Sequence, residues 1–234
     1  MKCLPAPVLL CALLCTCVTA SARTAFQARC EDTIGKSVSV MSSKQDGYRV
    51  ENGYSIHGLS AMKGDRARGS YVLGLTRTES RVTIGIQGRM LTDPASGYEC
   101  VAPRLEVKLH YLPIVVYVGR EFAPGTCAYR AILAHELRHR DIYLDFLPRA
   151  EKVVGDALAR RFEGKPLYAP RGQARALLQR EIDSGWMPFI KREMAKVEPL
   201  QASIDTPQEY ARLGKLCAGE VQSLIRPAKR KKDT

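Results

Sequence analysis

His135, Glu136 and His139 form an H-E-x-x-H pattern, whose residue types and spacing suit a zinc hydrolase. On an α-helix, residues i and i+4 lie one turn apart on the same face, so both imidazoles can reach one metal ion. Glu136 lies about 100° round the helix from His135, where its carboxylate can act on a water molecule without binding the metal. The chain has only four histidines, and two of them are in this pattern. The pattern therefore predicts a Zn²⁺ site with Glu136 as general base.

The surrounding sequence resembles the zincins, a superfamily of zinc-dependent metallopeptidases named for this helix. The run from Gly125 to His139, G-T-C-A-Y-R-A-I-L-A-H-E-L-R-H, is similar to secreted bacterial proteins classed as zinc peptidases. The motif covers five residues, and the looser similarity covers about the middle third of the chain. The resemblance implies that His135 and His139 bind zinc, that Glu136 is the base, and that the substrate is a peptide or protein.

A zinc site normally takes three protein ligands, so the H-E-x-x-H pattern leaves one ligand to be found. Metzincins, one group of zincins, have a glycine three residues after the second histidine and a further ligand three residues later. Ile142 and Asp145 stand at these two positions. Without the glycine, a continuing helix carries Asp145 too far along its axis to reach the metal. Asp145 is therefore a reserve candidate.

Glu181 is the first choice for the third ligand. In gluzincins a glutamate from a later helix binds the metal, and Glu181 falls in the apolar sector of a helix predicted over 173–197. A carboxylate directed into a core is costly unless it is paired or bound to metal, so an ion pair with an arginine is an equal alternative. Glu151 is a second reserve. Asp141, two residues after His139, is expected to orient a ligand histidine without binding the metal itself.

The N-terminal half, from about residue 47 to 118, alternates apolar and polar residues between turn signals, which predicts a small antiparallel or mixed sheet. The Asn52-Gly53 step predicts a β-hairpin. Pro113–Gly119 is predicted to be the strand before the metal helix. In zincins an edge strand near that helix pairs with the extended substrate, so the resemblance makes 113–119 the candidate. An interior strand is equally compatible with the sequence.

The second half of the chain is predicted to be helical. Pro148 lacks an N–H group and should end or kink the metal helix. The segment Thr206-Pro207-Gln208-Glu209 is a helix-start pattern, interpreted as purely structural. The helices are predicted over about 127–147, 148–162, 173–197 and from 206 onward. The fold class is therefore α+β, with a β-rich N-terminal half, a zincin-type metal helix and a helical C-terminal half, in one domain over residues 23–225.

The first 22 residues have the pattern of a secretory signal peptide. Lys2 precedes an apolar stretch, Val8–Val18, that is too short to span a bilayer, and Ala20-Ser21-Ala22 fits a cleavage site. The sequence therefore predicts an exported protein, periplasmic or secreted, with no transmembrane segment.

Export determines the expected state of the cysteines. Four of the eight lie within the signal peptide. An even number of remaining cysteines in an oxidising compartment predicts two disulfides, with three possible pairings that the sequence does not distinguish. The remaining cysteines are Cys30, Cys100, Cys127 and Cys217.

The chain is basic, with a formal net charge of +12, and residues 226–234 are predicted to form a flexible basic tail. The tail is expected to make at most weak contact with anionic envelope polymers. No aromatic residues interleave its charges, which argues against specific nucleic-acid binding.

The predicted function is zinc-dependent peptide hydrolysis by an exported enzyme. Two alternatives remain: a non-catalytic exported metal-binding or cell-envelope protein, and a basic module for an anionic polymer whose histidine spacing is coincidental.

Overall fold

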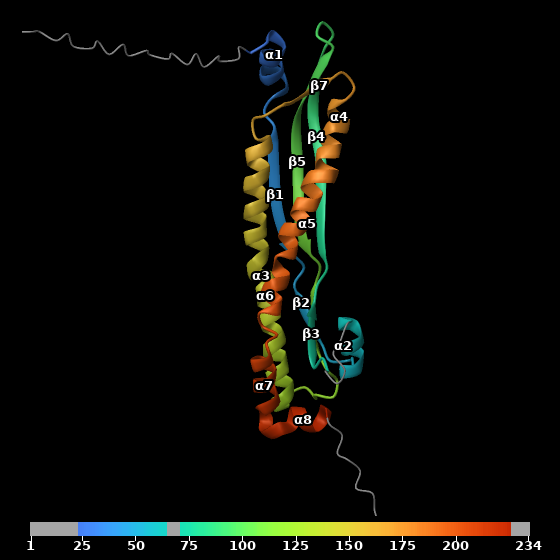
Figure 1. The fold of residues 1–234 in the computed structure, drawn as a ribbon, viewed down its shortest axis with the longest axis vertical. Helices are drawn as coiled ribbons and strands as arrows, with labels where there is room; N and C mark the ends of the chain where they lie inside the picture. Colours follow the sequence, from blue (N-terminus) through green and yellow to red (C-terminus); the bar gives the residue numbers. More distant parts are fainter. Residues whose placement is uncertain (1–22, 65–70, 226–234) are drawn as a thin grey trace, which may run out of the picture.

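The computed structural model describes residues 23–64 and 71–225 (Figure 1). The predicted signal peptide, 1–22, and the predicted tail, 226–234, lie outside the described residues. Strands dominate up to residue 118 and helices dominate after it, which confirms the predicted α+β class with a β-rich first half and a helical second half. Among the helices described, none is long and apolar enough to cross a membrane.

Seven strands and eight α-helices make up the described chain. The strands are β1 (Val38–Gln45), β2 (Tyr48–Glu51), β3 (Gly74–Arg77), β4 (Ser80–Asp93), β5 (Tyr98–Tyr111), β6 (Ile114–Val118) and β7 (Leu167–Pro170). The helices are α1 (Ala25–Ile34), α2 (Ile56–Lys63), α3 (Cys127–Phe162), α4 (Ala174–Glu181), α5 (Met187–Ala195), α6 (Val197–Ala202), α7 (Pro207–Lys215) and α8 (Glu220–Ile225). A π-helical turn, Ile182–Trp186, joins α4 to α5.

Three stretches of chain run the length of the molecule and form two sheets in succession. The first sheet has the order β1-β5-β4, and β7 pairs with the first residues of β5. The second sheet has the order β2-β6-β3. In both sheets the first pair of strands is parallel and the second pair is antiparallel. Because β1 leads into β2, β3 into β4 and β5 into β6, the elongated shape in Figure 1 follows from this repeated order.

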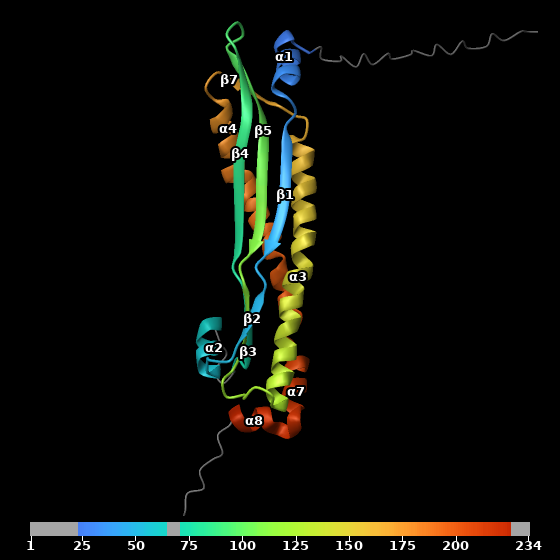
Figure 2. The same ribbon diagram turned by 180° about the vertical axis from the view of Figure 1, so that it is seen from behind.

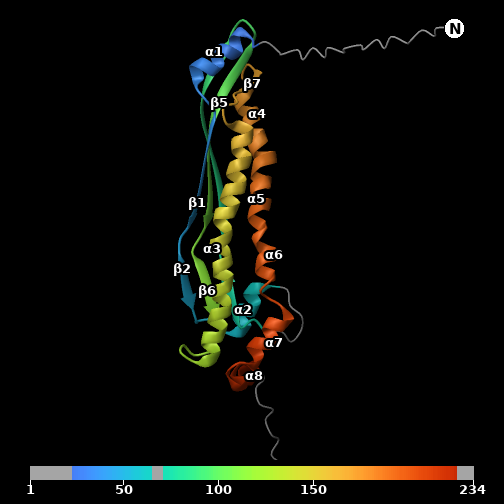
Figure 3. The same cartoon turned by 90° about the vertical axis from the view of Figure 1, so that its left-hand side faces the viewer.

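The helices cover one face of the first sheet (Figure 3). Leu105, Val107 and Leu109 alternate along β5 with exposed or half-buried polar residues, and they pack against α3, α5 and α6 in the largest apolar cluster. The strand period of two directs these residues toward the helices and Arg104 and Lys108 toward solvent. Figure 2 shows this opposite face, which α1 covers only at one end.

Two disulfides are present, as the sequence predicts. They join Cys30 to Cys100 and Cys127 to Cys217. The first attaches α1 to β5, beside a small apolar cluster that includes Phe26. The second attaches the start of α3 to the turn between α7 and α8, near the opposite end of the molecule.

Helix α3 is a single unbroken helix of 36 residues, so the predicted end at Pro148 is wrong. Buried residues recur along it with helical spacing, from Ile132 to Phe162, and tertiary packing on both sheets outweighs the loss of one backbone hydrogen bond. In the turn before the proline, the Arg149 side chain donates to the carbonyl oxygen of Asp145 at 3.1 Å. The helix therefore continues past the H-E-x-x-H motif.

Two predictions for the β half also need correction. Asn52 and Gly53 form no hairpin: β2 pairs with β6, and the Asn52 amide instead donates to the carbonyl oxygens of Val118, Gly119 and Phe122. The candidate substrate strand, β6, is interior, because β2 and β3 flank it. Strand β3 pairs with β6 on one side and with no other strand among the residues described.

Glu99 is buried and holds the first turn of α4. Its carboxylate accepts a hydrogen bond from the backbone N–H of Ala174 at 2.7 Å. Backbone N–H groups of Gly172, Ala174 and Gln173 lower the pKa of Glu99 in the folded protein. The contribution of Glu99 to stability is therefore present above its unfolded pKa and is lost as the pH falls through the folded value.

We expect Glu99→Gln to lower the free energy of unfolding by about 1 kcal/mol at neutral pH, because α4 loses a charged cap. Urea titrations at neutral and acidic pH measure this effect, and the difference from wild type should shrink in acid. Glu106→Gln, on the exposed face of the same strand, is the matched control and should change stability little. A loss of unfolding free energy of equal size at both pH values would contradict the role of the ionised Glu99 carboxylate as a cap of α4.

Candidate metal centre

His135 and His139 lie on the first half of α3, beside α6 and α7 (Figure 3). Both imidazoles are buried, with exposed fractions of 4% and 8%. Their Nε2 atoms each lie 3.2 Å from the same carboxylate oxygen, Oδ1 of Asp205. Asp205 belongs to the turn between α6 and α7, immediately before the Thr206 cap. The turn therefore brings a carboxylate to the two histidines from about 70 residues away in sequence.

The other ring nitrogen of each histidine has its own partner. His135 Nδ1 lies 3.1 Å from a carboxylate oxygen of Glu209, and His139 Nδ1 lies 2.6 Å from the amide oxygen of Gln201. The Gln201 amide nitrogen donates to the His139 carbonyl oxygen at 3.0 Å, which fixes the orientation of the amide. Both partners of the rings are acceptors, so each Nδ1 carries the proton and donates it. A ring protonated at both nitrogens also donates from Nε2 to Asp205, whereas in a neutral ring the Nε2 lone pair faces Asp205 and is available to a cation.

Three lone-pair donors thus converge on one point, which is the arrangement of a cation site. His135, His139 and Asp205 offer ligand atoms that all lie within 4.8 Å of one another. Ligands at 2.0–2.1 Å from a tetrahedral ion are roughly 3.3–3.4 Å apart, close to the two observed separations of 3.2 Å. Glu209 and Gln201 supply the outer hydrogen bonds that orient ligand histidines in metal sites. The residues present therefore fit a metal ion.

Asp205 is held ionised in this setting. Burial opposes its ionisation, but hydrogen bonds from His135 and His139 and the charge of Lys63 outweigh it and keep the pKa of Asp205 well below its usual range. The Lys63 ammonium, at the end of α2, donates to the second carboxylate oxygen at 3.1 Å. Lys63 therefore fixes the side-chain rotation that directs the other oxygen at the histidines.

Glu136 is buried between α3 and β3. Its carboxylate lies 2.9 Å from the Thr76 hydroxyl, which also contacts the Glu136 carbonyl oxygen at 2.9 Å. Gly74 makes room for it: a Cβ atom there would lie 2.6 Å from Cγ of Glu136. Burial raises the pKa of Glu136, although the charges of both motif histidines act in the opposite direction. A raised pKa is the property of a carboxylate that exchanges a proton near neutral pH.

A cleft of about 290 Å³ opens onto Glu136 and the histidine–aspartate cluster. One wall is formed by Gly74, Leu75 and Thr76 of β3, and the opposite wall by α6 and α7. Tyr210 of α7 also lines the cleft, and burial together with the charge of Asp205 raises its pKa, so its hydroxyl stays neutral and can donate. The cleft thus combines a candidate cation site, a buried carboxylate and a strand whose second side is unpaired among the residues that the structure describes.

Comparisons with protein-family models, with curated proteins and with solved structures find no match to this chain. The resemblance to zincins therefore stays a prediction from the motif.

The structure corrects the choice of Glu181 as third ligand. Its two carboxylate oxygens accept hydrogen bonds from the guanidinium of Arg161 at 2.8 and 2.7 Å, and Trp186 donates to it as well. Arg161 is about seven turns of α3, or about 39 Å, beyond His135. The ion pair with an arginine is therefore the correct alternative for Glu181, and the apolar sector of α4–α5 faces another part of the core.

The reserve candidates lie outside the cluster too. Asp145 is exposed on the continuing helix, as expected without a glycine at position 142. Glu151 accepts a hydrogen bond from Ser43 of β1. Asp141 is exposed and pairs with Arg140, so it does not orient a ligand histidine. Glu209 and Gln201 contact the histidine rings instead.

Asp205, Gln201 and Glu209 were not identified from the sequence. The available signal was the helix-start pattern at Thr206, whose interpretation as purely structural was incomplete. The Thr206 hydroxyl does accept from the Glu209 N–H at 3.1 Å, but the Glu209 carboxylate binds His135, Arg138 and Arg212. The hydrogen bond from Arg212, with further contributions from His135 and Arg138, lowers the pKa of Glu209 to about 2. A glutamate that does not close the capping box is free for another partner.

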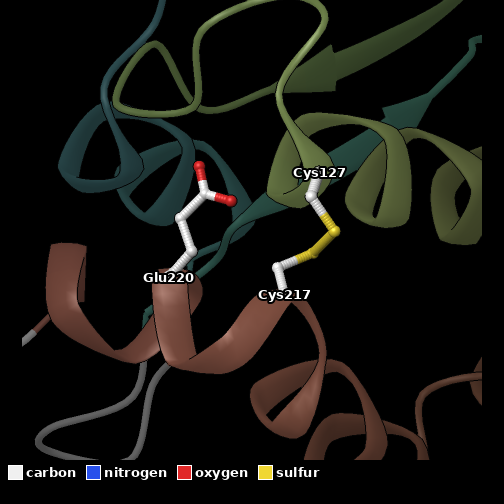
Figure 4. Close-up of side chains that lie close together, drawn as sticks. All are labelled: Cys127, Cys217 and Glu220. Atoms are coloured by element: carbon white, nitrogen blue, oxygen red, sulfur yellow. A yellow bond between two sulfur atoms is a disulfide. The ribbon is translucent and has the colours of Figure 1, made fainter.

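The Cys127–Cys217 disulfide, shown in Figure 4, joins the start of α3 to the segment that follows α7. Cys127 opens the helix that carries the histidines, and Cys217 follows the helix that carries Glu209. Glu220, beside the disulfide in Figure 4, accepts from the Ala128 N–H at 3.2 Å and so holds the same two segments together. The disulfide therefore restrains the segment that supplies Asp205 to the histidines.

We expect the double variant Cys127→Ser/Cys217→Ser to bind metal at least about tenfold more weakly, because the segment with Asp205 then has to be ordered on binding. Cys30→Ser/Cys100→Ser is the matched control. The Cys127–Cys217 and Cys30–Cys100 bridges span 90 and 70 residues. Their contributions to the free energy of unfolding should therefore be similar, at roughly 2–4 kcal/mol each. Only the Cys127→Ser/Cys217→Ser variant should show a changed metal affinity in a competition titration with a chelator. Equal losses of affinity in both variants would show a general effect of stability.

Proposed function

We propose that this protein is an exported zinc-dependent hydrolase of peptide bonds. The observation that supports the proposal is the convergence of His135, His139 and Asp205 on one point beside the buried carboxylate of Glu136. Two imidazole nitrogens and one carboxylate oxygen suit zinc, and three protein ligands leave a coordination position open, as in catalytic zinc sites. The ligand set thus differs from the sequence prediction only in its third member.

A bound zinc ion would polarise a carbonyl group and lower the pKa of a water molecule to about 7. Glu136 removes the proton from the attacking water and passes it to the nitrogen of the leaving amine. Thr76 holds the Glu136 carboxylate in position for both transfers. The neutral hydroxyl of Tyr210 donates to the carbonyl oxygen of the substrate as negative charge develops on it.

The side of β3 that faces away from β6, which pairs with no strand in the described part of the chain, supports an extended peptide as the substrate. Its residues Gly74, Leu75 and Thr76 form a wall of the cleft, and an unpaired strand offers N–H and C=O groups to a peptide of any sequence. The peptide-binding strand is thus proposed to be β3, in place of the interior strand β6. Export is supported by the signal pattern in the sequence and by the two disulfides.

The proposal is tested with purified mature protein. Elemental analysis should find about one zinc ion per chain, and an unfolded protein substrate should be cleaved, with fragments identified by mass spectrometry. A chelator should abolish cleavage, and added zinc should restore it. Zinc binding without cleavage of any unfolded protein would favour the non-catalytic metal-binding alternative. A lack of zinc binding would contradict the proposal at its first step.

A further inference from the structure

A second cavity, here called the side cavity, lies next to the metal cleft and has a volume of about 260 Å³. Tyr143 of α3 and Glu198 of α6 line both spaces. A peptide bound in the cleft can therefore place one of its side chains in the side cavity. Its wall is mixed: the apolar side chains of Val82, Met194 and Val197 line it together with polar residues that include Thr78 and Ser80.

Tyr111, one of the residues that line the side cavity, carries a buried hydroxyl. Tyr111 is 1% exposed, and its hydroxyl has no hydrogen-bond partner among the described residues. Its ring meets the Tyr143 ring edge-on, with centroids 5.3 Å apart. Burial raises the pKa of both phenols, to about 12 for Tyr143, so both hydroxyls stay neutral and can donate or accept. Buried polar groups in native proteins are nearly always satisfied, and because Tyr111, unlike Tyr168, lines the side cavity, we infer that a ligand bound there supplies the missing partner.

The charges around the side cavity favour a neutral ligand. Lys191 of α5 and Glu198 of α6 are both exposed and stand at its rim. Their opposite charges balance, so the rim carries no net charge that would select a cationic or an anionic group. A ligand with an apolar body and an uncharged polar tip satisfies both the wall and the hydroxyl.

We propose that the side cavity is a specificity subsite that binds the phenol side chain of a tyrosine in the substrate. The phenol ring packs against the Tyr111–Tyr143 pair, and its hydroxyl bonds to that of Tyr111. Phenylalanine fits the same space but leaves the Tyr111 hydroxyl unpaired, and sites built to bond a hydroxyl reject the analogue that lacks it. The role as a substrate subsite rests on the proposed function, whereas binding of the phenol can be measured without catalysis.

The binding test uses the zinc-loaded full-length mature protein with Glu136→Gln, which cannot turn over a substrate. The probes are N-acetyl-tyrosinamide and N-acetyl-phenylalaninamide, and their affinities are measured by ligand-observed NMR. The tyrosine compound should bind about tenfold more tightly, the value of one added hydrogen bond. Adding Tyr111→Phe should remove this preference while the phenylalanine compound still binds. Equal affinities, an unchanged preference after Tyr111→Phe, or no binding of either compound would overturn the proposal.

Tyr168→Phe is the matched control, because the Tyr168 hydroxyl is also buried without a partner among the described residues but packs against Phe26 of α1, away from the cleft. It should leave the preference unchanged. Peptides that differ only in tyrosine or phenylalanine then separate the two proposals. A tyrosine preference in binding with no cleavage by the wild type would contradict only the hydrolase, and cleavage without a tyrosine preference would contradict only the subsite.

Discussion

Asp205→Asn should weaken zinc binding by about 100-fold or more, whereas Glu181→Gln should leave it unchanged. The Asp205 carboxylate is the only acidic group in the cluster that faces both motif histidines among the residues described. The amide keeps the size and the turn but removes the negative charge that a zinc ion would neutralise. Competition titration with a chromophoric chelator measures the affinity, and elemental analysis measures the zinc content.

The Glu181→Gln variant makes the comparison specific. It removes an equal charge from a pair with Arg161, so it lowers stability by about 1 kcal/mol or less without reaching the metal centre. Circular dichroism of both variants should show the wild-type helix content. Retention of zinc by Asp205→Asn together with loss of zinc by Glu181→Gln would restore the ligand assignment made from the sequence.

The sequence predicts those residues of the candidate site that are close together in the chain. His135, Glu136 and His139 lie within two turns of one helix, and helical geometry alone fixes their relative directions. The third ligand depends on how α6 and α7 return to α3, about 70 residues later. Helical projection identifies a carboxylate that faces inward, but it does not say which part of the core that face meets. Glu181, at the end of α4, instead meets Arg161 near the end of α3 that is far from the histidines.

The misassigned elements have a similar cause. Pro148 is a strong local signal, but packing along both sheets keeps α3 continuous. Asn52-Gly53 is a strong hairpin signal, but β2 finds its partner in β6, more than sixty residues later. The position of β6 between two strands depends on the same long-range pairing. In each case a tertiary contact outweighs a local preference of the backbone.

The proposed reaction depends most on Glu136, and Glu136→Gln should lower the rate of peptide hydrolysis by at least about 100-fold, the usual contribution of a general base. The variant should keep its zinc, because the metal-binding groups and their partners Glu209 and Gln201 are unchanged. Glutamine fits the space beside Gly74 and can keep a hydrogen bond to Thr76, so the fold should persist. Initial rates on an unfolded protein, with zinc content measured on the same samples, give both quantities.

Asp141→Asn is the matched control for Glu136→Gln, because it makes the same carboxylate-to-amide change on the same helix, at an exposed position paired with Arg140. Its rate should stay within about twofold of wild type, since exposed ion pairs contribute little. Equal rates for Glu136→Gln and wild type, with zinc bound in both, would exclude Glu136 as the base. Loss of zinc in Glu136→Gln would instead identify Glu136 as a metal ligand, which its direction toward Thr76 and β3 argues against. The two readouts together therefore separate proton transfer from metal binding at this one residue.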